Sequence, residues 1–270
     1  MQRPGLVASD VDGTLLDPAE RISDRTRAAV HRVIAAGVPF VLVTGRPPRW
    51  IPPVVEQLGH AGLAVCANGA VLYDAATDRV RRAATLDPMQ LRSAADAVAA
   101  ALPGAKLAVE LPAGRARTNG FGQFLAEADY THPWPGADSE TAPRELLLSR
   151  PATKMLVRLS SASSDVMAVA IREILGATLD VTFSTGHGLI ELSPPGVTKG
   201  TGLALLAAEL DVPPAQVVAF GDMPNDLTML HWAGWGVAMA NAHPAVLGVA
   251  DEITAPNFED GVALALERWF

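Results

Sequence analysis

The sequence lacks several features that would mark it as a secreted, membrane or nucleic-acid-binding protein. It has one cysteine, Cys66, so an internal disulfide is excluded. Its apolar stretches are short and are interrupted by glycine, proline or charge, which excludes a membrane-spanning helix. It has no run of lysine or arginine, and its net charge is −8, which argues against a nucleic-acid partner.

The composition is that of a globular protein rather than a disordered one. Apolar residues make up 49% and charged residues 19% of the 270 residues, enough for one large domain or two smaller ones. The N-terminus leads directly into an apolar run and lacks the layout of a signal peptide. Together with the single cysteine, this predicts a cytoplasmic protein.

Apolar runs alternate with amphipathic helical patterns at both ends of the chain. The first third contains the runs LVA, VPFVLV and LAVCA, and Ser23 and Gly37 are suited to begin and end the helix between the first two. The last third contains a helical pattern over 198–209, the runs QVVAF and WGVAM, and a closing amphipathic helix. Buried strands joined by helices predict an α/β fold with a Rossmann-like parallel sheet.

The middle of the chain has a different pattern. It reads as a helix, the strand KLAVEL, an irregular stretch over 112–150, the strand KMLVRL, a helix over 165–175 and two short strands. We therefore expect an α/β core formed by residues 1–85 and 194–270, with an α+β cap inserted at 86–193.

Polar residues follow four of the predicted core strands. In an open α/β sheet, ligands bind outside the carboxyl ends of the strands, so these residues are candidates for one site. A helix that begins near Lys199 can reach the same crevice. The residues at the strand ends are Asp10 and Asp12, Thr44-Gly45-Arg46, Asn68-Gly69, and Gly221-Asp222 with Asn225 and Asp226.

This set contains more carboxylates than cations, which indicates a divalent metal ion. Oxygen ligands of this kind favour Mg²⁺. Carboxylates, a lysine, a threonine and Mg²⁺ suit phosphoryl transfer, because its catalysis consists mainly of positioning and charge neutralisation. Asp10 is then the candidate nucleophile that forms an aspartyl-phosphate, and Asp12 the candidate acid and base for the leaving group and for water.

The motifs DVDGT, TGR, VTKG and GDMPND resemble, in order and approximate spacing, the four motifs of the haloacid dehalogenase superfamily. The segments NGA, IELSPPGVTKG, MANA and NFEDGVALAL resemble its Cof-type sugar-phosphatase branch, in which a cap follows the third strand. The resemblance covers the core, whereas the cap matches in placement only. It implies a monomeric Mg²⁺-dependent phosphatase of a small phosphorylated metabolite, with a sugar phosphate as the first expectation.

The resemblance also implies roles for individual residues. Asp10, the Asp12 carbonyl and Asp222 bind Mg²⁺, with Asn225 and Asp226 supporting them, and Thr44 and Lys199 hold the phosphoryl oxygens. Gly45, Arg46, Asn68 and Asn225 are counted as further phosphate- or substrate-binding candidates, with Arg46 open between a substrate contact and a salt bridge.

Two alternatives remain open at this point. A phosphomutase, phosphotransferase or dedicated sugar phosphatase of the same superfamily would use the same core residues. A receiver-like signalling domain also forms an aspartyl-phosphate, but it would be about half this length and would carry its aspartate after the third strand. The substrate itself is not identified, since flavin mononucleotide and pyridoxal phosphate also fit the resemblance.

Overall fold

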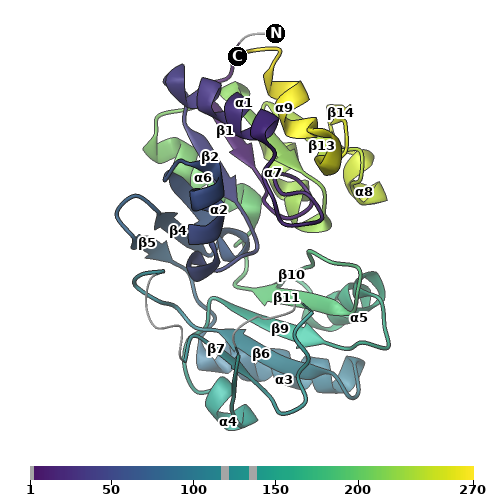
Figure 1. The fold of residues 1–270 in the computed structure, drawn as a ribbon. Coiled ribbons are helices and arrows are strands. Elements are labelled where there is room, and N and C mark those ends of the chain that lie inside the picture. Colours follow the sequence, from purple (N-terminus) through teal and green to yellow (C-terminus); the bar gives the residue numbers. More distant parts are fainter. Residues whose placement is uncertain (1–2, 117–121, 134–138) are drawn as a thin grey trace. The chain divides into compact units, whose positions relative to one another are not determined.

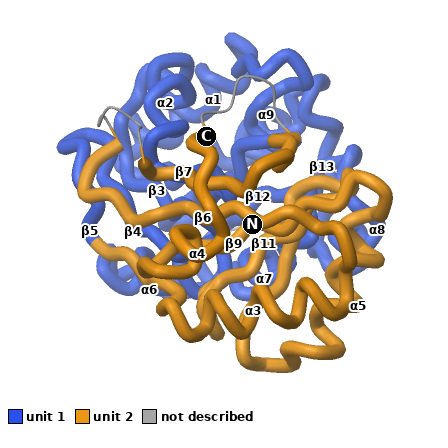
Figure 2. Tube along the Cα trace, turned by 90° about the horizontal axis from the view of Figure 1, so that it is seen from below, with its two compact units in different colours: residues 1–81, 198–270 blue, residues 82–197 orange. Residues whose placement is uncertain are grey.

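The computed structural model describes residues 3–116, 122–133 and 139–270 and divides the chain into two compact units. Unit 1 contains residues 1–81 and 198–270, and unit 2 contains residues 82–197 (Figures 1 and 2). The sequence predicts an inserted cap at 86–193. The role of unit 2 in selecting the substrate stays a prediction. Parts of the predicted irregular stretch, 117–121 and 134–138, lie outside the described residues.

An eight-stranded sheet forms the centre of unit 1 (Figure 1). Its strand order is β14-β13-β12-β1-β2-β3-β4-β5, and the pairs from β14 to β3 are parallel. The strands are β1 (Leu6–Ser9), β2 (Phe40–Val43), β3 (Leu63–Cys66), β4 (Val71–Asp74), β5 (Arg79–Ala83), β12 (Val217–Gly221), β13 (Trp235–Met239) and β14 (Glu252–Thr254).

The helices of unit 1 begin where the sequence offers capping residues. The Ser23 hydroxyl accepts from Thr26 N at the start of α1, and Thr198 and Thr201 form a capping box at the start of α6. The helices are α1 (Asp24–Ala35), α2 (Pro52–Leu58), α6 (Lys199–Glu209), α7 (Leu227–Trp232), α8 (Pro244–Leu247) and α9 (Gly261–Leu266). Short 3₁₀ turns are η1 (Pro48–Trp50), η2 (Ala67–Gly69), η3 (Pro214–Gln216), η4 (Pro224–Asp226) and η5 (Asn257–Glu259).

The central strands are apolar because both of their faces are covered. Leu6 and Ala8 of β1 belong to a buried cluster with Leu203 of α6 and Met229 of α7. Val7 points to the opposite face and is fully buried as well. Such strands are typical of a parallel sheet with helices on both sides, and the predicted α/β fold class is confirmed.

One edge of the sheet differs from the predicted all-parallel pattern. β4 pairs antiparallel with β3, because the chain returns through the tight turn η2, which leaves no room for a crossover helix. The closing helix, which the stretch FEDGVALALERWF predicts over 258–270, is shorter in the structure: α9 starts at Gly261, after Asp260 in a left-handed conformation (φ 60°), and ends at Leu266. No helix in the described ranges is long and apolar enough to cross a membrane.

Unit 2 has the predicted α+β composition. Its six-stranded sheet has the order β10-β11-β9-β6-β7-β8, and α3 and α5 pack against each other (Figure 1). The elements are α3 (Pro88–Ala101), β6 (Lys106–Glu110), β7 (Phe124–Ala126), β8 (Glu140–Thr141), α4 (Arg144–Leu147), β9 (Lys154–Arg158), α5 (Ser164–Leu175), β10 (Asp180–Thr182) and β11 (Leu189–Ser193).

Candidate active site

The carboxyl ends of four adjacent parallel strands bring the predicted site residues to one edge of the sheet. Asp10 follows β1, Thr44 follows β2, Asn68 follows β3 and Asp222 follows β12. These strands are neighbours in the order β12-β1-β2-β3. Residues far apart in the chain therefore meet here, as the crossover connections of a parallel sheet require.

Lys199 is a buried cation between two buried carboxylates. It is the first residue of α6, and its Nζ lies 2.7 Å from Asp10 Oδ1 and 2.6 Å from Asp226 Oδ1. Its exposed fraction is 1%, against 4% for Asp10 and 0% for Asp226. Burial alone would lower the pKa of Lys199, but the two carboxylates outweigh it and raise this pKa above its ordinary value.

Asp226 holds the loop after β12 as well as the lysine. Its Oδ1 accepts from Lys199, and its Oδ2 accepts from the backbone N–H groups of Asp222 (3.0 Å) and Met223 (2.9 Å). Gly221 permits this arrangement, because a Cβ there would overlap the Asp226 side chain. Both Asp226 oxygens are thus engaged by groups of the protein, and the role of Asp226 in supporting a metal site stays a prediction.

Asp222 is fixed from the loop that follows β1. Thr14 Oγ1 donates to Asp222 Oδ1 at 2.9 Å, and Gly13 (φ 77°) lies so close that a Cβ there would overlap Asp222 Oδ2. Burial raises the pKa of Asp222 to about 7, and Asp226 adds to this shift. Burial likewise raises the pKa of Asp10 well above its usual value, although Lys199 opposes it.

The donor set fits a divalent oxygen-liganded cation. Carboxylate oxygens of Asp10, Asp222 and Asp226 lie within 4.8 Å of one another, and with Lys199 the four groups carry a charge of −2 when all are ionised. Within the described residues, Asn225 Oδ1 is also buried and has no hydrogen-bond partner. Mg²⁺ binds such oxygen sites through few carboxylates while keeping several of its waters.

Asp12 is held by Arg46. Arg46 Nε lies 3.1 Å and 2.9 Å from the two Asp12 oxygens, and Nη2 lies 2.5 Å from Oδ1. The Arg46 backbone N–H also donates to Thr44 Oγ1 at 3.0 Å, across the half-buried Gly45. The sequence left Arg46 open between a substrate contact and a salt bridge. In this structure Arg46 makes the salt bridge, and a contact of Arg46 with substrate stays a prediction.

Asn68 and Asn225 are joined by a side-chain hydrogen bond. Asn225 Nδ2 donates to Asn68 Oδ1 at 3.0 Å, and both residues are buried. Asn68 is left-handed (φ 54°), and Gly69 (φ 101°) lies against the backbone carbonyl of Thr198, where a Cβ would overlap it. This contact joins the turn after β3 to the residue that precedes Lys199.

Three further residues contact the site without a role having been predicted for them: Thr14, which donates to Asp222, and Asn241 and Asn257, which contact the loop after β1. Asn241 donates to Gly13 O and Asn257 donates to Leu16 O. All three residues lie in motifs that the sequence offers: Thr14 is the last residue of DVDGT, and the asparagines lie in MANA and NFEDG.

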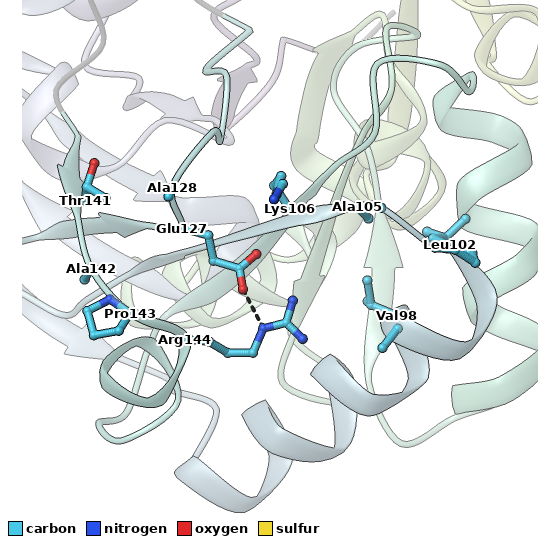
Figure 3. Close-up of a pocket in the computed structure, with 13 residues that line it drawn as sticks. Val98, Leu102, Ala105, Lys106, Glu127, Ala128, Thr141, Ala142, Pro143 and Arg144 are labelled. Carbon is cyan, nitrogen blue, oxygen red and sulfur yellow. Dashed lines mark hydrogen bonds and ion pairs between the residues drawn. The ribbon is translucent and has the colours of Figure 1, made fainter.

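A separate cavity of about 670 Å³ lies within unit 2 (Figure 3). It is lined by the C-terminal turn of α3 and the starts of β6 and α4, and Glu127 and Arg144 form an ion pair of 2.5 Å in it. None of the predicted catalytic or metal-binding residues lines it. We therefore take the carboxylate cluster of unit 1, and not this cavity, as the candidate active site.

The chain matches a family model and is similar in sequence to known phosphatases. Residues 7–266 match the family model described as haloacid dehalogenase-like hydrolase. The chain is 30% identical to 5-amino-6-(5-phospho-D-ribitylamino)uracil phosphatase YcsE of Bacillus subtilis, over 98% of this chain and 95% of that protein. It is 28% identical to phosphoglycolate phosphatase of Methanothermobacter thermautotrophicus, over 97% of both chains.

The fold has close structural counterparts. A haloacid dehalogenase-like hydrolase from B. subtilis superposes with a TM-score of 0.82 at 24% identity, over 98% of this chain and all of that one. At this identity the likeness concerns the fold alone.

The raised pKa of Asp222 predicts a pH-dependent effect of Asp222→Asn on the metal-free protein. Because the folded-state pKa, about 7, lies above the ordinary value of 3.8, Asp222 ionises in the unfolded chain before it ionises in the folded protein, and the wild type loses stability progressively as the pH rises between these two values. Asn keeps an acceptor for Thr14 but never ionises. In excess chelator, the stability gained by Asp222→Asn should grow from about pH 4 to pH 7 and then level off.

Urea unfolding of both proteins across this pH range measures the difference. Thr14→Val is the matched control, since it removes the hydrogen bond and leaves the carboxylate in place. A difference between wild type and Asp222→Asn that does not vary with pH would contradict this account of Asp222.

Proposed function

Because the chain belongs to the haloacid dehalogenase-like hydrolases, we propose that it is a Mg²⁺-dependent phosphatase that hydrolyses a small phosphorylated metabolite through an aspartyl-phosphate on Asp10. Its enzyme class, phosphoric monoester hydrolase, is that of the phosphatases to which it is similar. The observation that carries the proposal is the Lys199 ammonium bridging Asp10 and Asp226 beside Asp222.

The charge balance explains why Asp10 can approach a phosphate. A phosphoryl group brings further negative charge to a cluster that already has an excess of carboxylate. Lys199 offsets part of this charge, and a bound Mg²⁺, which Asp10, Asp222 and the Asp12 carbonyl would hold, would neutralise more of it. Positioning and neutralisation of this kind provide most of the catalysis in phosphoryl transfer.

The proposed reaction has two steps. Asp10 attacks phosphorus, the P–O bond to the leaving group breaks, and Asp12 gives that oxygen a proton. Asp12 then takes a proton from water as the water attacks phosphorus, which releases inorganic phosphate and restores Asp10. In the present conformation Asp12 forms a salt bridge with Arg46.

The substrate remains at the level of a class. The relatives include phosphatases of a ribitylamino-uracil phosphate and of phosphoglycolate, which differ in size and chemistry. We propose a sugar phosphate, with unit 2 as the cap that selects it, in a monomeric cytoplasmic enzyme. A screen of phosphorylated metabolites with and without Mg²⁺ tests the substrate class.

The phosphomutase and phosphotransferase alternatives use the same residues and are separated by the fate of the phosphoryl group. With a labelled sugar phosphate and a second sugar present, a hydrolase releases label as inorganic phosphate, whereas a transferase moves it to the second sugar. The receiver-like alternative is set aside, because the family match extends over residues 7–266.

Asp10→Asn should abolish hydrolysis of an aryl phosphate, and chelator should abolish the activity of the wild type. The substitution removes the nucleophilic oxygen and relieves carboxylate repulsion, so the variant should stay folded. Steady-state rates, circular dichroism and trapping of the acyl-phosphate by borohydride reduction measure these outcomes. Substantial turnover by the variant, or equal wild-type activity in excess chelator, would refute the proposal.

Asp12→Asn should slow the release of the leaving group from a sugar phosphate far more than from an activated aryl phosphate. An alkoxide leaving group needs a proton, whereas an acidic phenol needs little help, and general acid catalysis typically contributes about 10²–10⁴-fold. Single-turnover release of the leaving group from both substrates avoids interference from the second step. An equal loss on both substrates would show that Asp12 acts through charge or metal geometry instead.

A further inference from the structure

The loop after β1 is held by side-chain amides from the C-terminal part of the chain. Asn241, just after β13, donates from Nδ2 to the backbone carbonyl of Gly13 at 2.9 Å. Asn257, the first residue of η5, donates from Nδ2 to the carbonyl of Leu16 at 2.7 Å. Two carbonyls of the loop that carries Asp10 and Asp12 are thus paired by residues more than 220 positions away.

The two asparagines are also joined to each other. The Asn257 backbone N–H donates to Asn241 Oδ1 at 2.9 Å, so Asn241 donates from one end of its amide and accepts at the other. Aspartate in its place would have no donor for Gly13 O, and a shorter side chain would lose both contacts. The residue type is therefore dictated by the geometry.

These contacts reach the metal-binding candidates through Gly13 and Thr14. Gly13 lies against the Asp222 carboxylate, and Thr14 Oγ1 donates to Asp222 Oδ1. The His243 backbone N–H, two residues after Asn241, also donates to the carbonyl of Asp222 at 2.8 Å. The same C-terminal segment thus fixes the loop that carries Asp10 and the position of Asp222.

We propose that Asn241 and Asn257 are positioning residues that set the distance between Asp10 and Asp222 and so determine the affinity of the site for Mg²⁺. This inference rests on the proposed function, since it assumes the Mg²⁺ site. Both residues are at least partly exposed, so their hydrogen bonds contribute little to overall stability. Their effect is on geometry, in the way that outer partners of metal ligands typically change affinity by about 10–100-fold.

The test measures Mg²⁺ binding directly by titration calorimetry on the metal-free protein, without substrate. Asn241→Ala and Asn257→Ala should each weaken Mg²⁺ binding on the order of tenfold, with small changes in melting temperature. The double variant should lose less Mg²⁺ affinity than the product of the two single fold-losses, because the asparagines act as one connected pair.

Thr254→Val is the matched control. It removes a hydrogen bond in the same segment, from Thr254 Oγ1 to Gly261 O at 2.8 Å, and keeps both asparagine side chains, so it should leave Mg²⁺ affinity unchanged. Asparagine variants with wild-type affinity, or an equal loss in Thr254→Val, would overturn the inference. Absence of Mg²⁺ binding by the wild type would instead overturn the metal site of the proposed function.

Discussion

The arrangement depends on one ammonium group buried between carboxylates. A buried carboxylate without a partner is costly, and three of them together would be excluded from a folded core. Lys199 makes the cluster tolerable by contacting Asp10 and Asp226 at 2.7 and 2.6 Å. Because it supplies one positive charge for three carboxylates, the cluster keeps a net charge of −2 when all groups are ionised, which supports the proposed site for a divalent cation. A single residue thus accounts for both the stability of the site and its proposed affinity for metal and phosphate.

Close backbone approaches at three glycines position the residues of this cluster. Gly13 and Gly221 bring their loops into contact with the side chains of Asp222 and Asp226, where any Cβ would collide. Gly69 does the same against Thr198, just before Lys199. The charged groups therefore meet because three glycines allow backbone and side chain to approach more closely than other residues permit.

Much of this could be predicted from the sequence because the positions of polar residues follow from the positions of strands. Asp10, Thr44 and Asp222 each follow a continuous apolar run, and parallel strands bring such ends together whatever the details of packing. The fold class follows from the same alternation. Lys199 is placed by the capping threonine before it, which fixes where α6 begins.

The remaining features depend on side-chain directions and turns that periodicity does not encode. The pairing of Arg46 with Asp12 depends on rotamers, and the antiparallel β4 depends on left-handed Ala67 and Asn68 in a tight turn. The hydrogen bonds from Asn241 and Asn257 to the loop after β1 join residues far apart in sequence. Only the folded chain shows which carbonyl each amide reaches.

A double-mutant cycle of Lys199→Met and Asp226→Asn, read as the free energy of unfolding in chelator at neutral pH, tests the central claim most directly. Lys199→Met alone should destabilise the protein by about 3–5 kcal/mol, because it leaves buried carboxylates without a cation. Asp226→Asn should cost much less in the Lys199→Met background than in the wild type, because the ion pair is already absent. Additive effects, or a Lys199→Met variant as stable as the wild type, would contradict the account.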